Sequence, residues 1–222
     1  MAGSVGKGAA GLFMKGTNME YKLSPNPIFW SHQGEAHLRG FGMVFLRLAG
    51  CSVGCADCDT DYSCGERVET GELVRRVVAA FPKCRDKWVW LTGGEPADQN
   101  LRPLIGALSK AGLSVAVATS GKHRIIPPVA WISVSYHGGY PLSQAYGNEI
   151  KLVPGLNGID PWQFLEEYPD DQTDFFYRYV QPMWDNEKGC EDAESLKACI
   201  AFVKDNPNWS LSRQDHKVWG LK

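Results

Sequence analysis

The feature of this sequence that most limits its possible folds is an alternation of short apolar runs with segments of helical periodicity. The apolar runs, each long enough for one strand, cover residues 43–48, 87–91, 113–119, 131–135, 149–153, 175–180 and 209–211. Between several of them, apolar residues recur every three or four positions, which indicates helices with one buried face. These positions include Leu73, Val77, Val78, Phe81, Leu101, Leu104, Ile105, Leu108, Phe164, Leu196, Cys199, Ile200 and Val203. Strands that alternate with helices predict an α/β fold built on a parallel sheet.

The length of the chain limits how far such a sheet can close. The chain has 222 residues, whereas a complete eight-fold βα barrel typically takes about 250. We therefore expect a partial, open (βα) barrel. Four motifs directly follow apolar runs: the segment from Cys51 onward, Thr92-Gly93-Gly94, Thr119-Ser120-Gly121 and Ser135. Because reacting groups gather at the carboxyl ends of parallel strands, we expect these motifs to share one edge of the sheet.

Two helix boundaries follow from single residues. Thr70 precedes the first helical pattern and belongs to the residue types that cap helix N-termini. Gly112 follows the second pattern, where a residue with positive φ commonly ends a helix. Both boundaries place the helices between strands, as βα units require.

Composition excludes several classes of protein. The formal net charge is −2, without the basic excess of a nucleic-acid binder. No apolar run approaches the roughly 20 residues that a membrane-spanning helix needs. Residues 1–18 are rich in Gly and Ala and lack the apolar stretch of a secretory signal. We interpret them as a flexible leader or a remnant of cloning, and we expect a single domain over residues 19–222.

The chain contains seven cysteines, three of which form the motif C-x3-C-x2-C at Cys51, Cys55 and Cys58. An odd number of cysteines without a secretory signal favours free thiols in a reducing cytoplasm over disulfides. Soft thiolates suit iron–sulfur clusters and zinc. A cluster normally takes four thiolates, so a triad leaves one iron open to a substrate or cofactor. Gly50 and Gly54 permit the tight loop that this spacing requires.

A zinc site is the alternative interpretation of the triad, with Cys64 as the fourth ligand. The other cysteines have simpler interpretations. Cys199 falls on an apolar helix face and is expected in the core. Cys84 and Cys190 are expected to be surface or loop thiols. A zinc-stabilised binding module therefore stays open as a function of a different class.

The triad resembles that of the radical S-adenosylmethionine (SAM) superfamily, and Leu91-Thr92-Gly93-Gly94-Glu95-Pro96 resembles the Gly-Gly-Glu-Pro motif of the same superfamily. More narrowly, the chain resembles the 7-carboxy-7-deazaguanine synthase family from about residue 26 to residue 222. The matching segments are Ile28-Phe29, Gln33-Gly34-Glu35, Phe45-Leu46-Arg47-Leu48-Ala49-Gly50-Cys51, Cys58-Asp59-Thr60, Asn148-Glu149-Ile150-Lys151, Gln181-Pro182 and Gln214-Asp215-His216-Lys217. Each piece is short, and the combination is specific.

The resemblance implies a lyase reaction. A reduced [4Fe–4S] cluster cleaves SAM to a 5′-deoxyadenosyl radical, which abstracts hydrogen from 6-carboxy-5,6,7,8-tetrahydropterin. The ring then contracts and loses ammonia to give 7-carboxy-7-deazaguanine, an intermediate of queuosine and 7-deazapurine biosynthesis. The resemblance also implies Mg²⁺, a homodimer and an electron donor such as flavodoxin.

Residue roles are implied in the same way. The cluster ligands are Cys51, Cys55 and Cys58, and Thr60 is the magnesium ligand. The implied SAM contacts are Asp57, Cys58, Asp59, Gly94, Ser135, Tyr136 and His137. The implied substrate contacts are His32, Gln33, Gly34, Arg47, Thr92 and the terminal Lys222, with Arg47 paired to the substrate carboxylate.

Several of these residues also have structural interpretations. Arg47 lies in an apolar strand, so it can instead form a buried ion pair. Thr60 can cap the next turn, and Gly93-Gly94 can be an ordinary tight turn. His216 and Lys217 can be an exposed pair on the surface.

The sequence departs from the family pattern at three places. Ala118 stands where the family has a glutamate before Thr-x-Gly, so a carboxylate toward the pterin is missing there. Ser135-Tyr136-His137 stands where the family has Ser-Pro-Lys, and His137 can replace the lysine charge only when protonated. Ala36 replaces the last glycine of Gln-Gly-Glu-Gly. These departures concern the substrate more than SAM, so another small radical SAM enzyme, such as a glycyl-radical activase, is the second candidate.

Overall fold

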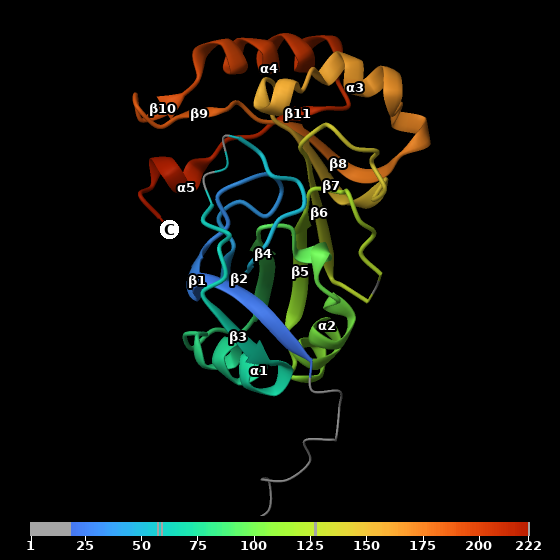
Figure 1. Ribbon diagram of the computed structural model, residues 1–222. Helices are drawn as coiled ribbons and strands as arrows, with labels where there is room; N and C mark the ends of the chain where they lie inside the picture. The colour runs from blue at the N-terminus through green and yellow to red at the C-terminus, as the bar shows by residue number, and fades with distance from the viewer. Residues whose placement is uncertain (1–18, 57, 59, 127, 222) are drawn as a thin grey trace, which may run out of the picture.

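The structure is a computed structural model that describes residues 19–56, 58, 60–126 and 128–221. Its core is a nine-stranded sheet with the order β11-β8-β7-β6-β5-β4-β2-β1-β3 (Figure 1). The strands are β1 (Glu20–His32), β2 (Gly42–Leu48), β3 (Glu66–Glu69), β4 (Trp88–Gly93), β5 (Ser114–Thr119), β6 (Trp131–Tyr136), β7 (Tyr146–Leu152), β8 (Asp174–Val180) and β11 (Ser210–Leu211). A separate two-stranded sheet pairs β9 (Trp184–Asp185) with β10 (Cys190–Glu191).

In the nine-stranded sheet, every neighbouring pair along the strand order from β11 to β2 is parallel. Strand β1 runs antiparallel to both of its neighbours, β2 and β3. The predicted α/β class with a mostly parallel sheet is therefore confirmed. Within the described residues, β3 and β11 end the strand order without pairing to each other. The sheet is thus open rather than a closed barrel, as the chain length predicted.

The helices cover one face of the sheet and its upper end. They are α1 (Thr70–Ala79), α2 (Leu101–Lys110), α3 (Pro161–Glu167), α4 (Ala193–Asp205) and α5 (Asp215–Val218). In α1 the residues Leu73, Val74 and Val77 are buried, and α2 buries four of its apolar residues in the same core. Figure 1 shows α3 and α4 above the carboxyl ends of β7 and β8, with the short α5 beside the loop that follows β1. Cys199 is fully buried in α4, as its apolar helix face predicted.

Some elements differ from the sequence expectations. The strand β1 was not anticipated, because Pro25 and Pro27 interrupt its pattern; the register with β2 shifts between Leu23 and Ile28. Thr70 is the first residue of α1 rather than its N-cap: Glu69 precedes it, and the Thr70 hydroxyl donates to the Met19 carbonyl. In contrast, Gly112 follows the end of α2 with φ +80, as predicted.

The connections after β5 and β6 contain no helix in the part of the chain that the structure describes. The βα repeat is therefore incomplete, and loops fill the carboxyl edge of the sheet there. In the same described residues, no helix has the length and apolarity to cross a lipid bilayer.

Candidate active site

The cysteine motif lies in the loop that follows β2, at the carboxyl edge of the sheet. Gly50 and Gly54 have φ of +88 and +67, so this loop uses backbone conformations that glycine adopts without strain. Cys51 and Cys55 are half-buried and Cys58 is exposed. Over the described ranges, no three His, Cys, Asp or Glu side chains are gathered as they stand to hold a metal ion. The cluster therefore stays a prediction that rests on the donor chemistry of three thiols in one short loop.

The second glycine motif packs directly against the base of the cysteine loop. The Gly94 N–H donates to the Leu48 carbonyl and the Glu95 N–H donates to the Gly50 carbonyl, both at 2.9 Å. A Cβ atom on Gly94 would lie 1.8 Å from the Gly50 oxygen and 3.1 Å from the Cys51 Cβ. A side chain cannot be placed there, so the motif is more than a free-standing tight turn. Gly94 thereby lets the loop after β4 pack directly against the backbone of the cysteine loop.

Glu95 connects the ends of β4 and β5, and its role was missed from the sequence. Its side chain is 1% exposed. The carboxylate accepts hydrogen bonds from the Thr119 hydroxyl at 2.8 Å and from the Ser120 N–H at 2.7 Å. It also accepts from the Ala97 N–H at 2.9 Å. A buried carboxylate needs such partners, so its place in the Gly-Gly-Glu-Pro motif was the available clue.

Two charged residues, from the loops after β4 and β5, form hydrogen bonds that hold the cysteine loop in place. Asp98 accepts from the Ser52 N–H at 2.6 Å and from the Ser52 hydroxyl at 2.7 Å. Lys122 donates to the Ser52 carbonyl at 2.8 Å. Neither residue was singled out from the sequence. Together they tie the loop after β2 to the loops after β4 and β5.

The segment Ser135-Tyr136-His137 ends β6 beside the cysteine loop. The Tyr136 side chain packs in the core against Phe164 and donates its hydroxyl proton to the Tyr140 carbonyl. Burial raises the pKa of Tyr136. Any SAM contact at position 136 would therefore use the backbone. The His137 ring instead reaches Cys55, with Nδ1 3.0 Å from the sulfur.

A row of side chains crosses the sheet face that α1 and α2 leave uncovered. Arg47 pairs in register with Thr92, Ala118 with Ser133, and Ser133 with Glu149. Leu91 pairs with Val117, which places Thr92 and Ala118 side by side as well. Because alternate residues of a strand share a face, the row forms a strip that is polar except at Ala118.

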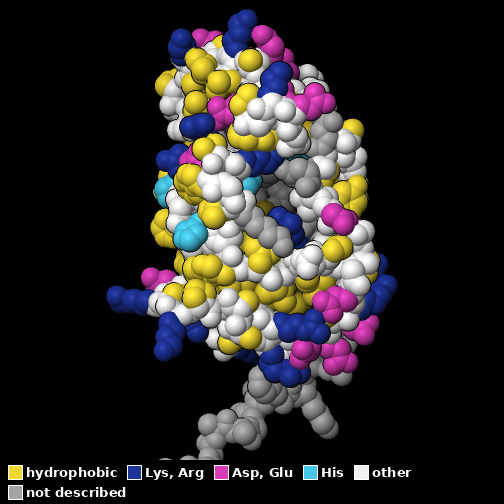
Figure 2. Space-filling view, turned by 90° about the vertical axis from the view of Figure 1, so that its left-hand side faces the viewer, with side chains coloured by type: hydrophobic (Ala, Val, Ile, Leu, Met, Phe, Trp, Pro, Cys, Tyr) yellow, Lys and Arg dark blue, Asp and Glu magenta, His cyan; other side chains and the backbone are white. Residues whose placement is uncertain are grey.

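Below this strip, toward the strand N-termini, lies a second cluster of buried and partly buried side chains: Leu38, Met43, Phe45, Trp88, Trp90, Ala116, Ala118 and Trp131. Figure 2 shows a hollow on one side of the molecule with basic side chains inside it and hydrophobic side chains along its lower rim. A polar strip above an apolar floor suits a flat heterocycle that carries hydrogen-bonding groups.

The predicted substrate ligand Arg47 is half-buried in this strip. Its guanidinium lies 5.0 Å from the centroid of the Phe29 ring, and Phe29 stacks on Phe45. Across the described part of the chain, Arg47 has no ion-pair partner. The alternative of a structural ion pair is therefore not supported, and the aromatic contact orients the guanidinium.

The row confirms that Ala118 contributes no carboxylate, but Glu149 supplies one farther along the same strip. Burial raises the pKa of Glu149. The carboxylate accepts from the His37 N–H at 3.1 Å. Glu149 thereby ties β7 to the segment that follows β1.

The segment after β1, residues 33–37, contains the predicted substrate contacts Gln33 and Gly34. The side-chain amide oxygen of Gln33 accepts hydrogen bonds from the Gly34 N–H at 2.9 Å and from the Glu35 N–H at 3.2 Å, which stabilises the turn. Glu35 forms an ion pair with Lys151 of β7. It also accepts from Gln181 at 3.2 Å and from Gln214 at 3.1 Å.

The ionisation of Glu35 follows from these contacts. Burial alone would raise the pKa of this carboxyl, but the attraction and hydrogen bond of Lys151 outweigh it, with help from His216 and Gln214. The result is a pKa lowered from 4.5 to about 2. Glu35 is therefore a charged junction that joins the segment after β1 to strand β7 and to the chain near residue 214.

The C-terminal segment packs on the same turn. The Asp215 N–H donates to the Gly34 carbonyl at 2.9 Å, and Arg39 pairs with Asp215 at 3.1 Å. A Cβ on Gly34 would lie 2.4 Å from His216 Nδ1. His216 therefore packs against the predicted substrate segment and is not simply one of an exposed surface pair.

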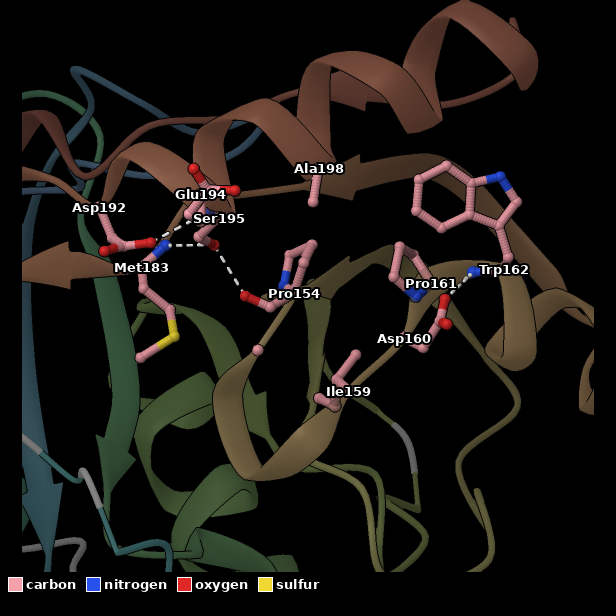
Figure 3. A pocket seen from close by; sticks show the side chains of 11 residues that line it. Pro154, Ile159, Asp160, Pro161, Trp162, Met183, Asp192, Glu194, Ser195 and Ala198 are labelled. Carbon is pink, nitrogen blue, oxygen red and sulfur yellow. Dashed lines mark hydrogen bonds between the residues drawn. The ribbon is translucent and has the colours of Figure 1, made fainter.

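Two cavities lie near these loops. One, of about 310 Å³, borders the cysteine loop and is lined by Ser52, Val53, Gly54, Lys122, Gly138, Gly139, Tyr140 and Asn157. The other, of about 360 Å³, lies between the loop after β7, the start of α3 and the start of α4 (Figure 3). In the second cavity Asp160 and Asp192 cap α3 and α4, and the Ser195 hydroxyl donates to the Pro154 carbonyl at 2.7 Å. Neither lining contains a predicted site residue, but the first cavity borders the cysteine loop through Ser52, Val53 and Gly54. We therefore assign the chemistry to the side of the first cavity and to the polar strip.

Comparisons with known proteins identify relatives of this chain. No protein-family model matches the sequence. The 7-carboxy-7-deazaguanine synthase of Nitratidesulfovibrio vulgaris is 33% identical over 91% of this chain and 100% of its own length. The Escherichia coli K12 protein of the same name is 34% identical over 91% of this chain and 100% of its own length. The crystal structure of QueE from Escherichia coli matches with a TM-score of 0.69 and 27% identity, over 88% of this chain and 94% of that one.

The chain belongs to the 7-carboxy-7-deazaguanine synthase family.

As a member of the 7-carboxy-7-deazaguanine synthase family the protein is an enzyme, as predicted. The alternatives of a zinc-stabilised binding module and of a glycyl-radical activase are not supported. Cys64, the fourth ligand of the zinc alternative, is exposed and donates its thiol proton to the Glu66 carbonyl.

The structure brings most of the predicted residues of the synthase family to one edge. Those at the carboxyl edge or on the strip are Arg47, Cys51, Cys55, Cys58, Thr60, Thr92, Gly94, Ser135 and His137. His32 ends the antiparallel strand β1 and pairs with Gly42 at the start of β2, so it lies at the opposite end of that strand; the segment after it, which contains Gln33 and Gly34, reaches β7 through His37. Three others, Asp57, Asp59 and Lys222, lie outside the described residues. The roles assigned to all of these residues stay predictions.

Proposed function

We propose that this protein is a radical SAM lyase that converts 6-carboxy-5,6,7,8-tetrahydropterin to 7-carboxy-7-deazaguanine with loss of ammonia, within queuosine or other 7-deazapurine biosynthesis. One observation carries the proposal: full-length relatives named for this product share the sequence, while the cysteine triad and Gly94 meet at the carboxyl edge of the same open sheet.

The thiols of Cys51, Cys55 and Cys58 fit a [4Fe–4S] cluster by donor chemistry, since one loop offers three soft ligands and leaves one iron open. When bound, the cluster and SAM supply the 5′-deoxyadenosyl radical that abstracts hydrogen from the substrate. The protein's part is to hold and shield these groups. Gly94 permits close backbone approach to SAM, and Ser135 offers a hydroxyl on the neighbouring strand.

The substrate is proposed to lie over the polar strip. Arg47 binds its carboxylate through a bidentate fork, and the Thr92 hydroxyl lies beside Arg47 in register. Gln33 and Gly34 close over the heterocycle from the segment after β1. Glu35 and Glu149 hold that segment against β7 and help exclude water from the pocket.

The remaining parts of the proposal rest on the resemblance. Thr60 offers a hard oxygen ligand for Mg²⁺, which keeps waters and binds substrate oxygens as well. A homodimer, a reduced electron donor such as flavodoxin and a cytoplasmic location complete the proposal.

The test is purification without oxygen, followed by metal analysis and turnover. About four irons per chain, a brown protein, and formation of 5′-deoxyadenosine and 7-carboxy-7-deazaguanine after reduction with dithionite are expected. Bound iron and SAM cleavage without a deazaguanine product would support the radical SAM chemistry and overturn the proposed substrate. A colourless protein that holds zinc would overturn both.

A further inference from the structure

The ring of His137 lies between a predicted cluster ligand and the end of β6. Its Nδ1 atom is 3.0 Å from the Cys55 sulfur, and its Nε2 atom is 3.2 Å from the Ser135 hydroxyl oxygen. Both nitrogens therefore have a partner on opposite sides of the ring.

The backbone of His137 is held as firmly as its ring. Its N–H donates to the Tyr140 hydroxyl oxygen at 3.1 Å, and its carbonyl accepts from the Asn157 side-chain amide at 3.0 Å. Tyr140 in turn donates its hydroxyl proton to the Ser120 carbonyl at 3.1 Å. The position of the imidazole is thus determined by several contacts that do not involve the cysteine loop.

These contacts are consistent with one tautomer of the ring. The Ser135 hydroxyl can donate to Nε2, which leaves the proton on Nδ1. The Nδ1–H group then faces the Cys55 sulfur. A thiolate at this place can accept only from such a donor, because sulfur that ligates a metal has lost its own proton.

We propose that His137 donates an Nδ1–H hydrogen bond to the Cys55 thiolate of the iron–sulfur cluster and thereby raises the reduction potential of that cluster. The inference rests on the proposed function, since it needs a cluster at the triad. One-electron reduction adds negative charge that the ligand sulfurs share, so a donor stabilises the reduced form more than the oxidised form. Hydrogen bonds to the sulfurs are among the factors that set such potentials.

This positioning role is specific to this chain's own residues. The ring nitrogens of His137 are engaged with Cys55 and Ser135, so the ring contacts the predicted cluster ligand directly.

The experiment compares His137→Leu with His137→Asn in the full chain. Leucine and asparagine have nearly the same shape, and the asparagine amide nitrogen can take the place of Nδ1. The two variants therefore differ chiefly in the donor. Each protein is loaded with iron and sulfide without oxygen, and the reduced fraction is followed by electron paramagnetic resonance during a dithionite titration with mediator dyes.

We expect the ratio of reduced to oxidised cluster in His137→Leu to be about tenfold lower than in the wild type at a fixed applied potential, which corresponds to a potential about 59 mV more negative for one electron. The reduction potential of His137→Asn should lie close to that of the wild type, because the amide nitrogen restores the donor. The iron content should be equal in all three proteins, since none of the three ligand thiols is changed.

The outcomes separate the two proposals. Equal potentials in wild type, His137→Leu and His137→Asn, with a full iron content, would overturn the hydrogen bond and leave the proposed function intact. A shift of the same size in both variants would also overturn it, because it would trace to ring packing rather than to the donor. A wild type that loads no iron would overturn the proposed function together with the inference.

Discussion

Replacing Lys151 by methionine removes the positive charge beside Glu35 and keeps a side chain of similar length. In the wild type, the pKa of Glu35 falls from 4.5 to about 2. At about 1.4 kcal/mol for each pKa unit, this difference corresponds to about 3 kcal/mol of folding free energy at neutral pH. The Glu35 side chain is 21% exposed, so solvent screens the pair only in part. We expect Lys151→Met to lose at least about 3 kcal/mol at pH 7, within the range seen when one partner of a buried pair is removed.

The dependence on pH gives the prediction its sign. A carboxyl whose pKa is lowered by folding contributes stability that is complete above its unfolded pKa of 4.5 and is lost as the pH falls toward about 2. Without Lys151, burial is the dominant influence and the pKa of Glu35 in the folded state rises above 4.5. The free energy of unfolding of the variant therefore increases as the pH falls from 7 to 4.5. In the wild type Glu35 stays ionised over that range and does not change the free energy of unfolding.

Urea denaturation of the metal-free protein under reducing conditions, followed by tryptophan fluorescence, measures both effects. Arg76→Met is the matched control, because Arg76 pairs with Glu66 and Glu72 on the surface and is 41% exposed. An exposed pair of this kind contributes little to the free energy of unfolding, because solvent screens it. Equal losses in Lys151→Met and Arg76→Met, or a loss in Lys151→Met that does not change between pH 7 and 4.5, would refute the reasoning.

Four further predictions concern the site. Cys64→Ala should keep the full iron content, whereas Cys58→Ala should lose most of it, as iron analysis of the two purified proteins will show. Loss of iron in Cys64→Ala would instead support the set of four ligands that includes Cys64. Arg47→Lys should weaken substrate use at least tenfold at unchanged SAM affinity, because a point charge cannot reproduce a bidentate fork; parallel losses in steady-state substrate kinetics and SAM binding would indicate a structural role. Thr60→Ala should raise the Mg²⁺ concentration needed for half-maximal turnover severalfold, and a superimposable magnesium titration would argue against that ligand. Gly94→Ala should abolish SAM binding and cost more than about 1 kcal/mol of stability, because its Cβ would lie 1.8 Å from the Gly50 oxygen; near-normal binding by calorimetry would contradict the close approach.

Local patterns were sufficient to predict seven strands of the nine-stranded sheet, namely β2, β4 to β8 and β11, but not β1 or β3. A run such as residues 113–119 is apolar because a central parallel strand is buried on both faces, so β5 could be identified without any knowledge of its neighbours. The carboxyl ends of parallel strands meet at one edge, so the cysteine loop and Gly94 could be predicted to lie together. The structure places Gly94 against Gly50.

Local patterns failed where a residue's role depends on a partner far away in the chain. Glu35 illustrates this, because its partner Lys151 lies 116 residues farther along the chain. Thr70 is a good N-cap by type, yet it bonds to Met19, 51 residues away, and leaves the cap position to Glu69. His137 was assigned from its neighbours in sequence, and only folding brings its ring to Cys55.

The sequence by itself therefore determined the α/β class, the open sheet and the loops that hold the reactive thiols, because strand and helix periodicities and the spacing of ligands are properties of adjacent residues. The tertiary structure decided which partners fasten those loops: Asp98 and Lys122 on Ser52, Lys151 on Glu35, and Ser135 on His137. The physical reason is that a polar group buried by folding must find a hydrogen-bond or charge partner wherever the fold provides one, and periodicity along the chain carries no record of that choice.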